Sequence, residues 1–392
     1  MEATLFIKLA GGLAYLLVGG DLLVRGAVAL ARRFHVPSVV IALTVVAFGT
    51  SLPELVVVID ATLSGYPGLV LGNVVGSNIA NVLLVAGAAA AIYPLVSGEQ
   101  SVRRDSLFMI GASLLLVGLS RNGVLTREEG FVLLAGIVAI TALSAREATR
   151  AYRESQLKAP MEWVLGLPTK IGMILLFILV GVVFLPLGAH LVVTSSVEIA
   201  AALGVSETVV GLSVLAIGTS LPELATTVVA AVQKRTEVAI GTVVGSNLFN
   251  ILAVLGITAA VSPSAIGVPD AALVLDLPVM VAVAIACLPF FANGYSLLRW
   301  EGILFLAYYV AYLAYLVLDS GDHALRDSYT VAMLGFMLPL SLITVIVISV
   351  RSRRRERSSP GGGDPARAAE GLYSSSWRAR GEPSWMPGRG SR

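Results

Sequence analysis

The chain has 392 residues, of which 56% are hydrophobic and only 13% are charged, whereas an ordinary soluble domain has about 25% charged residues. This composition excludes a soluble globular protein and a nucleic-acid-binding protein, and it predicts a polytopic helical membrane protein. The formal net charge is +2, and the single cysteine, Cys287, lies in an apolar run, so a disulfide framework and a cysteine-rich metal site are excluded.

Apolar stretches long enough to cross a membrane recur along most of the chain. We expect eleven, near residues 4–24, 37–63, 69–93, 105–120, 127–145, 170–192, 206–232, 237–261, 271–291, 299–318 and 328–350. Glycine, proline and serine mark the connections, as in Ser64–Gly68. A cleaved signal peptide is not expected, because the first stretch lacks a preceding basic segment and runs on into Asp21.

The longest interior polar segment divides the chain into two halves of five expected spans each. We therefore expect a first transmembrane repeat at 1–145, a loop at 146–169, a second repeat at 170–318, an additional helix at 319–350 and a tail at 351–392. The tail is rich in Gly, Pro, Ser and Arg and is predicted to be disordered. Its basic beginning is a candidate contact for anionic lipid headgroups, although a plain stop-transfer anchor also explains it.

Lysine and arginine gather in alternate loops, which the positive-inside rule assigns to the cytoplasm. The basic loops contain Arg25, Arg32, Arg33, Arg103, Arg104, the segment 146–169, Lys234, Arg235 and Arg299. The predicted location is thus the cell (inner) membrane, with the N-terminus outside and the C-terminus in the cytoplasm. Because five spans per half is an odd number, the two halves are predicted to lie antiparallel, as an inverted repeat.

Two polar strings recur in these halves at a constant separation of 169 residues, as Glu54 and Glu223 show. The first string is Gly-Thr-Ser-Leu-Pro-Glu-Leu at 49–55 and 218–224, and the second is Gly-Ser-Asn-x-x-Asn at 76–81 and 245–250. A carboxylate at membrane depth is energetically expensive and usually functional. A duplicated cluster of carboxylates and hydroxyls therefore predicts a cation site between the repeats.

The glycine and proline of the first string predict a break in the second and seventh spans. Carbonyls released by the break, for which Ala47 and Ala216 are candidates, are expected to face the site. Thr50 and Glu54 are four residues apart, as are Ser77 and Asn81, so each pair shares a helix face, and the second repeat has the same spacing. Oxygen ligands without thiols or imidazoles suit calcium, sodium or magnesium.

With both copies of these strings, the chain resembles a prokaryotic-type sodium/calcium exchanger of the cation/calcium antiporter superfamily. The motif regions are about 37–87 and 206–256. The resemblance implies ten core helices, alternating access by sliding of the first and sixth spans, and antiport of Ca²⁺ and Na⁺ without enzymatic activity or a cofactor. It implies calcium ligands at Thr50, Glu54, Thr219 and Glu223, and sodium ligands at Ala47, Ser51, Ser77, Asn81, Ala216, Ser220, Ser246 and Asn250.

One departure from the family pattern is Asn250, where many relatives have aspartate. Two carboxylates match one divalent ion, so we expect potassium-independent, electrogenic exchange. Three alternatives stay open: a calcium/proton exchanger using the same glutamates, a cation channel, and an intramembrane protease. The last is disfavoured because His190 is too near a span end to pair with a nucleophile.

Several other residues carry weaker expectations. Glycines in and just before the second strings are expected to form a small-residue packing stripe, at Gly72, Gly76, Gly241 and Gly245. Asp60 and Asp276 lack counterparts at the 169-residue offset and are expected to face a cavity or to be structural. Asp21 and His190 are expected to snorkel toward the membrane surface.

Overall fold

The computed structural model describes residues 2–34, 36, 38–96, 100–155, 167–202, 217–270, 272–287, 296–319 and 346. The predicted loop at 146–169 is therefore described only in part. Ala216, the tail at 351–392 and all but one residue of the expected span at 328–350 lie outside the described residues.

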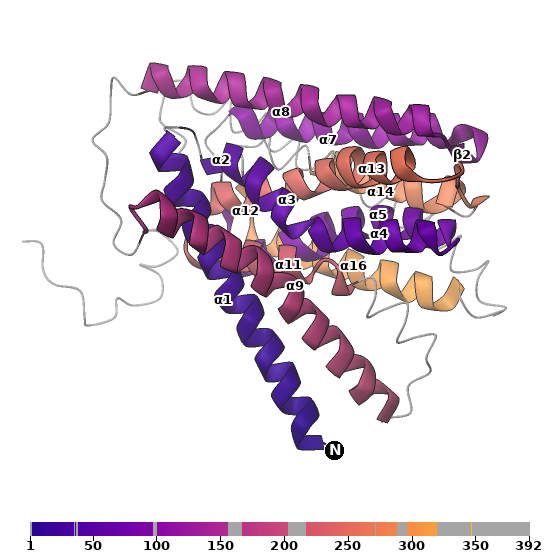
Figure 1. Cartoon of the computed structure of the whole chain (residues 1–392), viewed down its shortest axis with the longest axis horizontal. Coiled ribbons are helices and arrows are strands. Elements are labelled where there is room, and N and C mark those ends of the chain that lie inside the picture. The colour runs from indigo at the N-terminus through magenta and orange to yellow at the C-terminus, as the bar shows by residue number, and fades with distance from the viewer. Residues whose placement is uncertain are drawn as a thin grey trace, which may run out of the picture.

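The described chain is a bundle of helices, several of which are interrupted (Figure 1). The first repeat contains α1 (Glu2–Phe34), α2 (Ser38–Ile41), η1 (Ala42–Val46), α3 (Ala47–Thr50), α4 (Leu52–Leu63), α5 (Pro67–Ala80), η2 (Asn81–Ala86), α6 (Gly87–Ile92), β1 (Leu95–Val96), α7 (Gln100–Leu119), η3 (Ser120–Asn122), β2 (Val124–Leu125) and α8 (Arg127–Ser155). The second contains α9 (Ile171–Ala202), α11 (Leu221–Val232), α12 (Thr236–Leu248), η4 (Phe249–Val254), α13 (Leu255–Val261), β3 (Ile266–Gly267), η5 (Ala272–Asp276), α14 (Leu277–Ala286), β4 (Ser296–Leu297) and α16 (Arg299–Asp319).

Four continuous helical segments of the described chain are long and apolar enough to cross a membrane, namely Thr4–Phe34, Leu69–Ile92, Ile171–Ile199 and Thr236–Val261. A fifth candidate consists of Ser38–Thr50 and Leu52–Leu63, which meet at a bend of 43°. The prediction of a polytopic helical membrane protein is confirmed, whereas the number of eleven spans stays a prediction.

Three helices are longer than the apolar stretches that predicted them. α1 continues to Phe34, α8 to Ser155 and α9 to Ala202, beyond the expected ends at 24, 145 and 192. The expectation that the chain becomes a loop at 146 was therefore wrong for its first ten residues, 146–155. Arg, Glu and Ala are good helix formers, so the helix continues after its apolar segment ends.

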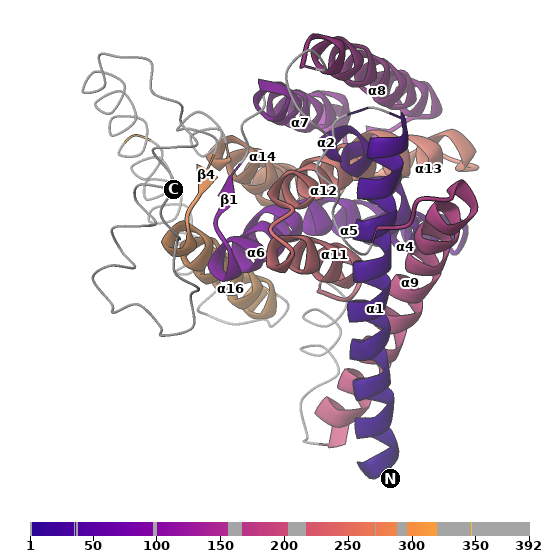
Figure 2. The same cartoon turned by 90° about the vertical axis from the view of Figure 1, so that its left-hand side faces the viewer.

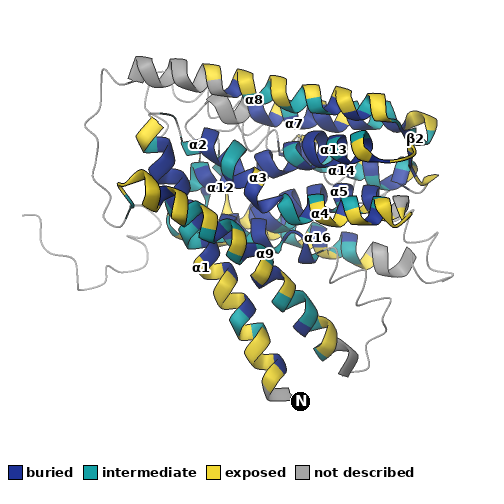
Figure 3. Cartoon of the chain, viewed as in Figure 1, coloured by how far each residue is buried: buried dark blue, intermediate teal, exposed yellow. Residues whose placement is uncertain are grey.

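The most enclosed candidate spans are the two that carry the second string of each repeat, Leu69–Ile92 and Thr236–Val261. Segment Thr236–Val261 has 94% of its apolar window buried, whereas Ile171–Ile199 has only 22%. Figure 3 shows the same contrast, with buried residues concentrated around α3, α5 and α12 and exposed residues along α1 and α9. The polar strings of the sequence therefore lie in the most enclosed part of the protein.

α1 and α9 lie side by side at the edge of the bundle (Figure 2). Their backbones approach closely at glycines: a Cβ added to Gly12 would lie 2.9 Å from the carbonyl oxygen of Gly188, and one added to Gly181 would lie 2.8 Å from that of Gly19. Small residues permit such close helix contacts in membranes. The two glycine pairs follow the 169-residue relation, since Gly12 corresponds to Gly181 and Gly19 to Gly188, so this contact is also pseudosymmetric.

Two short antiparallel strand pairs connect the repeats. β1 pairs with β4, which Figure 2 shows beside it, and β2 pairs with β3. Span parity predicts that β1 and β4 both lie on the cytoplasmic side and that β2 and β3 both lie outside. Each pair thus joins connections predicted on one face, as does the bond from the Arg127 guanidinium to the Ser262 carbonyl at 3.0 Å. Antiparallel placement of the repeats accounts for all three contacts.

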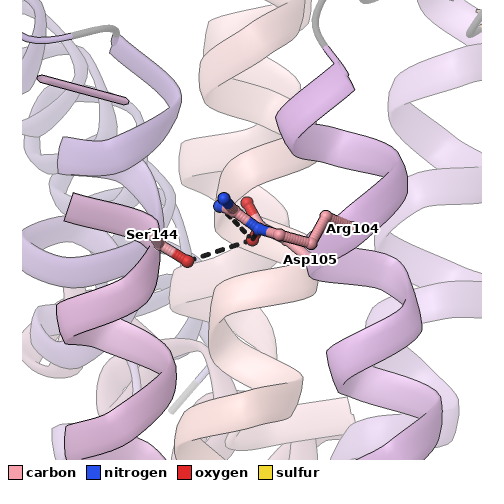
Figure 4. Close-up of polar contacts among 3 residues, drawn as sticks. All are labelled: Arg104, Asp105 and Ser144. Atoms are coloured by element: carbon pink, nitrogen blue, oxygen red, sulfur yellow. Dashed lines mark hydrogen bonds and ion pairs between the residues drawn. The ribbon is translucent and has the colours of Figure 1, made fainter. Parts of the chain in front are cut away.

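α7 and α8 are connected by a buried carboxylate (Figure 4). The Asp105 Oδ1 atom accepts hydrogen bonds from Ser144 Oγ at 3.0 Å and from Arg104 Nη2 at 2.8 Å. Asp105 is only 1% exposed, and a buried charge is tolerated only when it is paired and hydrogen-bonded. This cluster therefore fixes the beginning of α7 relative to the middle of α8.

Asp21 does not snorkel freely, contrary to the sequence prediction. Its Oδ1 atom accepts hydrogen bonds from Arg25 Nε at 2.9 Å and from Gln233 Nε2 at 2.6 Å. The second bond joins α1 to the connection that follows α11. The expectation failed because Gln233 is distant in sequence and is brought to Asp21 only by helix packing. His190, its counterpart, is exposed, and its placement near the membrane surface stays a prediction.

Candidate ion-binding site

The two copies of the first string form the same local structure. Thr50 ends α3, Ser51 leaves helical geometry at φ −86° and ψ 5°, and α4 begins at Leu52. Ser220 has nearly the same conformation, at φ −86° and ψ 2°, before α11 begins at Leu221. A proline follows each break at the second helical position, where its missing amide is tolerated. The predicted break is confirmed, and it places Glu54 and Glu223 in the first turn of each new helix.

The second strings each lead into a π-helical segment. η2 begins at Asn81 and η4 includes Asn250. Short π-helical segments inside α-helices are frequent at functional sites, because the wider turn changes the direction of side chains. The two asparagines are completely buried, with 0% exposure. Each repeat therefore delivers one amide to the interior where its helix is locally widened.

Hydroxyl groups of one repeat contact those of the other in a reciprocal pattern. Thr50 Oγ1 lies 3.3 Å from Ser246 Oγ, and Ser77 Oγ lies 3.3 Å from Thr219 Oγ1. Each pair joins the first string of one repeat, at the helix break, to the second string of the other repeat. The structure thus brings the separate motifs into one cluster at the interface between the repeats.

The two carboxylates are in different surroundings, although both are 0% exposed. Ser51 Oγ donates to Glu223 Oε1 at 3.3 Å, and the hydroxyls of Thr50 and Ser246 lie beside the same carboxylate. Neither carboxylate oxygen of Glu54 has a hydrogen-bond partner. Glu54 and Glu223 are near enough to interact electrostatically.

Several buried oxygens of the repeated strings have no hydrogen-bond partner. The unpaired atoms are Oε1 and Oε2 of Glu54, Oε2 of Glu223, Oγ of Ser220, and Oδ1 of Asn81 and Asn250. Leaving buried polar atoms unpaired costs about 1–3 kcal/mol each, and more for charged groups. Such a convergence is expected where a bound ion completes the coordination. The oxygen donors match the preference of calcium and sodium.

The backbone near the break differs from the prediction. The carbonyl oxygen of Ala47 accepts the amide of Ser51 at 3.0 Å and the hydroxyl of Thr50 at 3.3 Å, so the break does not release it. The reason is the position of the break, which falls after Ser51 and leaves the partner of Ala47 in place. The carbonyl that loses its usual donor four residues later is that of Gly49, because Pro53 has no amide hydrogen. Ala216 lies outside the described residues.

Outcomes for the weaker expectations are mixed. Gly241 and Gly245 form the predicted close contacts, with positions for a Cβ at 2.8 Å from Ala42 Cβ and 2.7 Å from Ala47 Cβ. For Gly72 and Gly76 the prediction is not tested, because the counterparts of those partners, 211 and 216, lie outside the described residues.

The two unmatched aspartates differ from each other. Asp276 has a structural contact, since the Tyr312 hydroxyl lies 3.4 Å from its Oδ1. Asp60 is instead exposed in the last turn of α4, so its expected placement in a cavity or in the packing is not confirmed.

The sequence analysis did not identify three buried polar residues close to the strings. Asn78 and Asn247 each have an unpaired Oδ1 atom, while their amide nitrogens contact Val74 O at 2.7 Å and Met109 Sδ at 3.3 Å. Thr227, four residues after Glu223, has an unpaired hydroxyl. The asparagines are part of the repeated string and were visible there. The signal for Thr227 was its spacing from Glu223.

No group of three or more His, Cys, Asp or Glu side chains gathers as a metal cluster among the residues that the structure describes. The candidate site therefore combines two carboxylates with neutral hydroxyl and amide oxygens. Such a site provides two negative charges, enough to balance one divalent cation, and neutral oxygens of the kind that also bind monovalent cations.

Comparison with known proteins agrees with this geometry. A family model described as "Sodium/calcium exchanger protein" matches residues 4–145 and 173–318. The chain belongs to the sodium/calcium exchanger family. The two matched segments correspond to the first and the second repeat, and each contains both polar strings of its repeat.

Among curated members of the sodium/calcium exchanger family, the chain is 32% identical over 344 residues to the sodium/calcium exchanger MaX1 of Methanosarcina acetivorans, covering 79% of this chain and 98% of that protein. It is 35% identical over 289 residues to a putative antiporter, CaxA, of Alkalimonas amylolytica, covering 74% and 89%. The structure of the sodium-calcium exchanger NCX_Mj, soaked with 2.5 mM Na⁺ and 10 mM Sr²⁺, superposes with a TM-score of 0.68 at 29% identity, covering 80% of this chain and 99% of that one. The helical membrane fold and the exchanger-type antiporter class are thereby confirmed.

Proposed function

We propose that this antiporter exchanges one calcium ion for sodium ions at the interface between its repeats by alternating access. The observation that supports the proposal most is the unpaired, fully buried carboxylate of Glu54 beside that of Glu223. Two carboxylates enclosed in a membrane protein without a cation would be costly. Their arrangement therefore suits a transporter in which one bound cation is replaced by another.

The proposed calcium ligands are Glu54 and Glu223 with the hydroxyls of Thr50 and Thr219. These hydroxyls already contact the opposite repeat at 3.3 Å, so an ion bound between the glutamates would replace few strong bonds. The proposed sodium ligands add the oxygens of Ser51, Ser77, Asn81, Ala216, Ser220, Ser246 and Asn250. Ala47 is left out, because its carbonyl already accepts two hydrogen bonds. Competition for shared oxygens would couple the two ions without a cofactor.

The charge of the site suggests how exchange responds to voltage. With amides at Asn81 and Asn250 the site carries two negative charges when both glutamates are ionised. One calcium ion balances this charge, whereas three sodium ions would leave one positive charge on the loaded site. Movement of an uncompensated charge across a membrane is worth about 2.3 kcal/mol per 100 mV. We therefore propose electrogenic exchange that requires no potassium.

The orientation in the membrane is also part of the proposal. The basic connections, the strand pairs and the distribution of Lys and Arg support a cytoplasmic face that contains the α1–α2 and α11–α12 connections. Burial and the charge of Arg32 lower the pKa of Arg235, so these two connections lie close together. The N-terminus is then outside, and the C-terminus is cytoplasmic if the segment 319–350 crosses the membrane.

The test is labelled calcium flux in proteoliposomes, with a sodium gradient, a proton gradient and a membrane voltage imposed separately. We expect calcium movement that follows the sodium gradient, changes with voltage and is the same with and without potassium. A proton ionophore should leave the flux unchanged. Flux that follows only the proton gradient would assign the protein to calcium/proton exchange instead, and flux without any counter-ion gradient dependence would indicate a channel.

A further inference from the structure

Thr227 differs from six other threonines in the helices that the structure describes. Six described threonines donate their hydroxyl to the carbonyl four residues earlier, at 2.7–2.8 Å: Thr44, Thr62, Thr194, Thr226, Thr242 and Thr258. This bond is the usual way in which a helical threonine satisfies its hydroxyl in an apolar environment. Thr227 is 0% exposed, yet its hydroxyl has no partner.

Helix geometry places this hydroxyl beside the candidate ion site. α11 runs without a break from Leu221 to Val232, so Thr227 lies one turn after Glu223 on the same face. Helical side chains lean toward the N-terminus, and the Thr227 side chain therefore leans toward the turn that carries Glu223. The Oε2 atom of the Glu223 carboxylate is also unpaired. Two unpaired buried oxygens therefore lie on consecutive turns of one helix face.

Thr227 is on the same side of Glu223 as two other hydroxyls of the site. The chain enters α3 from the side of the α1–α2 connection and reaches Thr50 before Glu54. α11 runs the opposite way, from Glu223 past Thr227 toward Gln233, whose side chain donates to Asp21 of α1. Thr50 Oγ1 is 3.3 Å from Ser246 Oγ, and both hydroxyls lie beside Glu223. The three hydroxyls and the carboxylate thus surround the half of the site that is nearer to the face of the α1–α2 connection.

We propose that Thr227 is an additional sodium ligand in this half of the site, which rests on the proposed sodium/calcium exchange. It would complete a subsite with Glu223, Thr50 and Ser246. A monovalent cation fits this subsite better than calcium, because a single carboxylate and neutral hydroxyls supply its oxygens. The calcium position between the two carboxylates is separate from Thr227 and is affected only indirectly.

The opposite half of the site lacks this ligand. The counterpart of Thr227 at the 169-residue offset is Val58, which follows Glu54 by one turn on α4 and is also 0% exposed. Thr219, Ser77 and Glu54 therefore have no fourth side-chain oxygen at the equivalent place. The inverted repeats are unequal here, and sodium is expected to bind more tightly from the face of the α1–α2 connection than from the opposite face.

The test compares Thr227→Val with Thr226→Val in the full chain. Both threonines are 0% exposed and adjacent on α11, and valine has nearly the same shape, but the Thr226 hydroxyl is already bonded to the Pro222 carbonyl at 2.8 Å. The first measurement is the sodium concentration that gives half of the maximal thermal stabilisation of purified protein. The second is the sodium concentration for half-maximal exchange in vesicles of known orientation, with sodium added to one face at a time.

Thr227→Val should raise the half-maximal sodium concentration about fivefold, as expected for the loss of one neutral oxygen contact. The increase should be confined to the face of the α1–α2 connection, and calcium-dependent stabilisation should change little. Thr226→Val should leave these values unchanged. Val58→Thr should lower the half-maximal sodium concentration at the opposite face.

Equal sodium responses of Thr227→Val and Thr226→Val, in a protein that still exchanges calcium for sodium, would overturn this inference alone. A wild-type protein that sodium neither stabilises nor drives would instead overturn the proposed function, and the sodium subsite with it. An equal loss of calcium and sodium stabilisation in Thr227→Val would assign the hydroxyl a structural role.

Discussion

Neutralising one carboxylate of the candidate site should separate ion binding from folding. Glu54→Gln removes a charge whose two oxygens have no partner, and Glu223→Gln retains an oxygen that can accept the Ser51 hydroxyl. A divalent ion about 4 Å from a carboxylate interacts with it by about 2 kcal/mol at the dielectric constant of water and by about 8 kcal/mol at an effective value of 20. Even the smaller value weakens calcium binding about 30-fold.

The assay is the calcium-dependent stability of purified protein, followed by calcium flux. At a calcium concentration 100 times the dissociation constant, the wild-type protein gains about 2.7 kcal/mol, whereas a variant with 30-fold weaker binding gains about 0.9 kcal/mol. The difference is measurable as a lost shift of the melting temperature. With the larger interaction of about 8 kcal/mol, both variants would stay empty at calcium concentrations that saturate the wild type, and sodium-driven calcium flux should be abolished.

Glu301→Gln is the matched control. Glu301 is a buried carboxylate outside the site, and its Oε2 accepts the amide of Leu298 at 2.7 Å, a bond that glutamine also provides. This variant should keep both the calcium shift and the flux. Near wild-type transport in Glu54→Gln or Glu223→Gln, at equal amounts of folded protein, would show that the carboxylates do not bind the transported calcium.

Three further changes test the surroundings of the site. Gly188→Leu should destabilise the α1–α9 contact by about 1–3 kcal/mol, because a Cβ there would lie 2.8 Å from the Gly12 carbonyl, whereas Gly172→Leu, with nothing within 4 Å, should leave the melting temperature unchanged. Asp21→Ala should increase deuterium exchange at the end of α11, and unchanged exchange would show that its 2.6 Å contact contributes nothing. Ser144→Ala should lower the free energy of unfolding by about 1.5–3 kcal/mol, since its hydroxyl binds a buried carboxylate, and a loss below about 0.5 kcal/mol in a denaturation curve would contradict this.

The composition of the site could be predicted from the sequence because it is repeated. One glutamate in an apolar stretch has several explanations, but Glu54 and Glu223 occur in identical strings, and the odd number of spans in each repeat requires opposite orientation. The break at Ser51 and Ser220 was predictable for a similar reason, because proline and glycine act locally. The structure adds the reciprocal hydroxyl contacts, which depend on helix packing.

Features that depend on tertiary contacts or on the exact register of a break were not predictable. The residues that follow Asn81 do not distinguish a π-helical turn from an α-helical one, since an apolar sequence of this kind is compatible with either. Ala47 was expected to lose its hydrogen bond, but its donor Ser51 stays in place, and the lost bond lies two residues later, at Gly49. The bond between Asp21 and Gln233 joins residues more than 200 positions apart.

The strand pairs described above have a consequence for how the protein is made. β1 and β2 belong to the first repeat, yet each pairs only with a strand of the second. When the ribosome has inserted residues 1–145, these edges are open, and the buried oxygens of Glu54 and Asn81 have no opposite half. The first repeat must therefore persist in the membrane as an incomplete intermediate until α12 arrives between its helices. We expect that the halves synthesised separately would be degraded when alone and rescued when co-expressed, so that the unit of assembly is the whole pair of repeats.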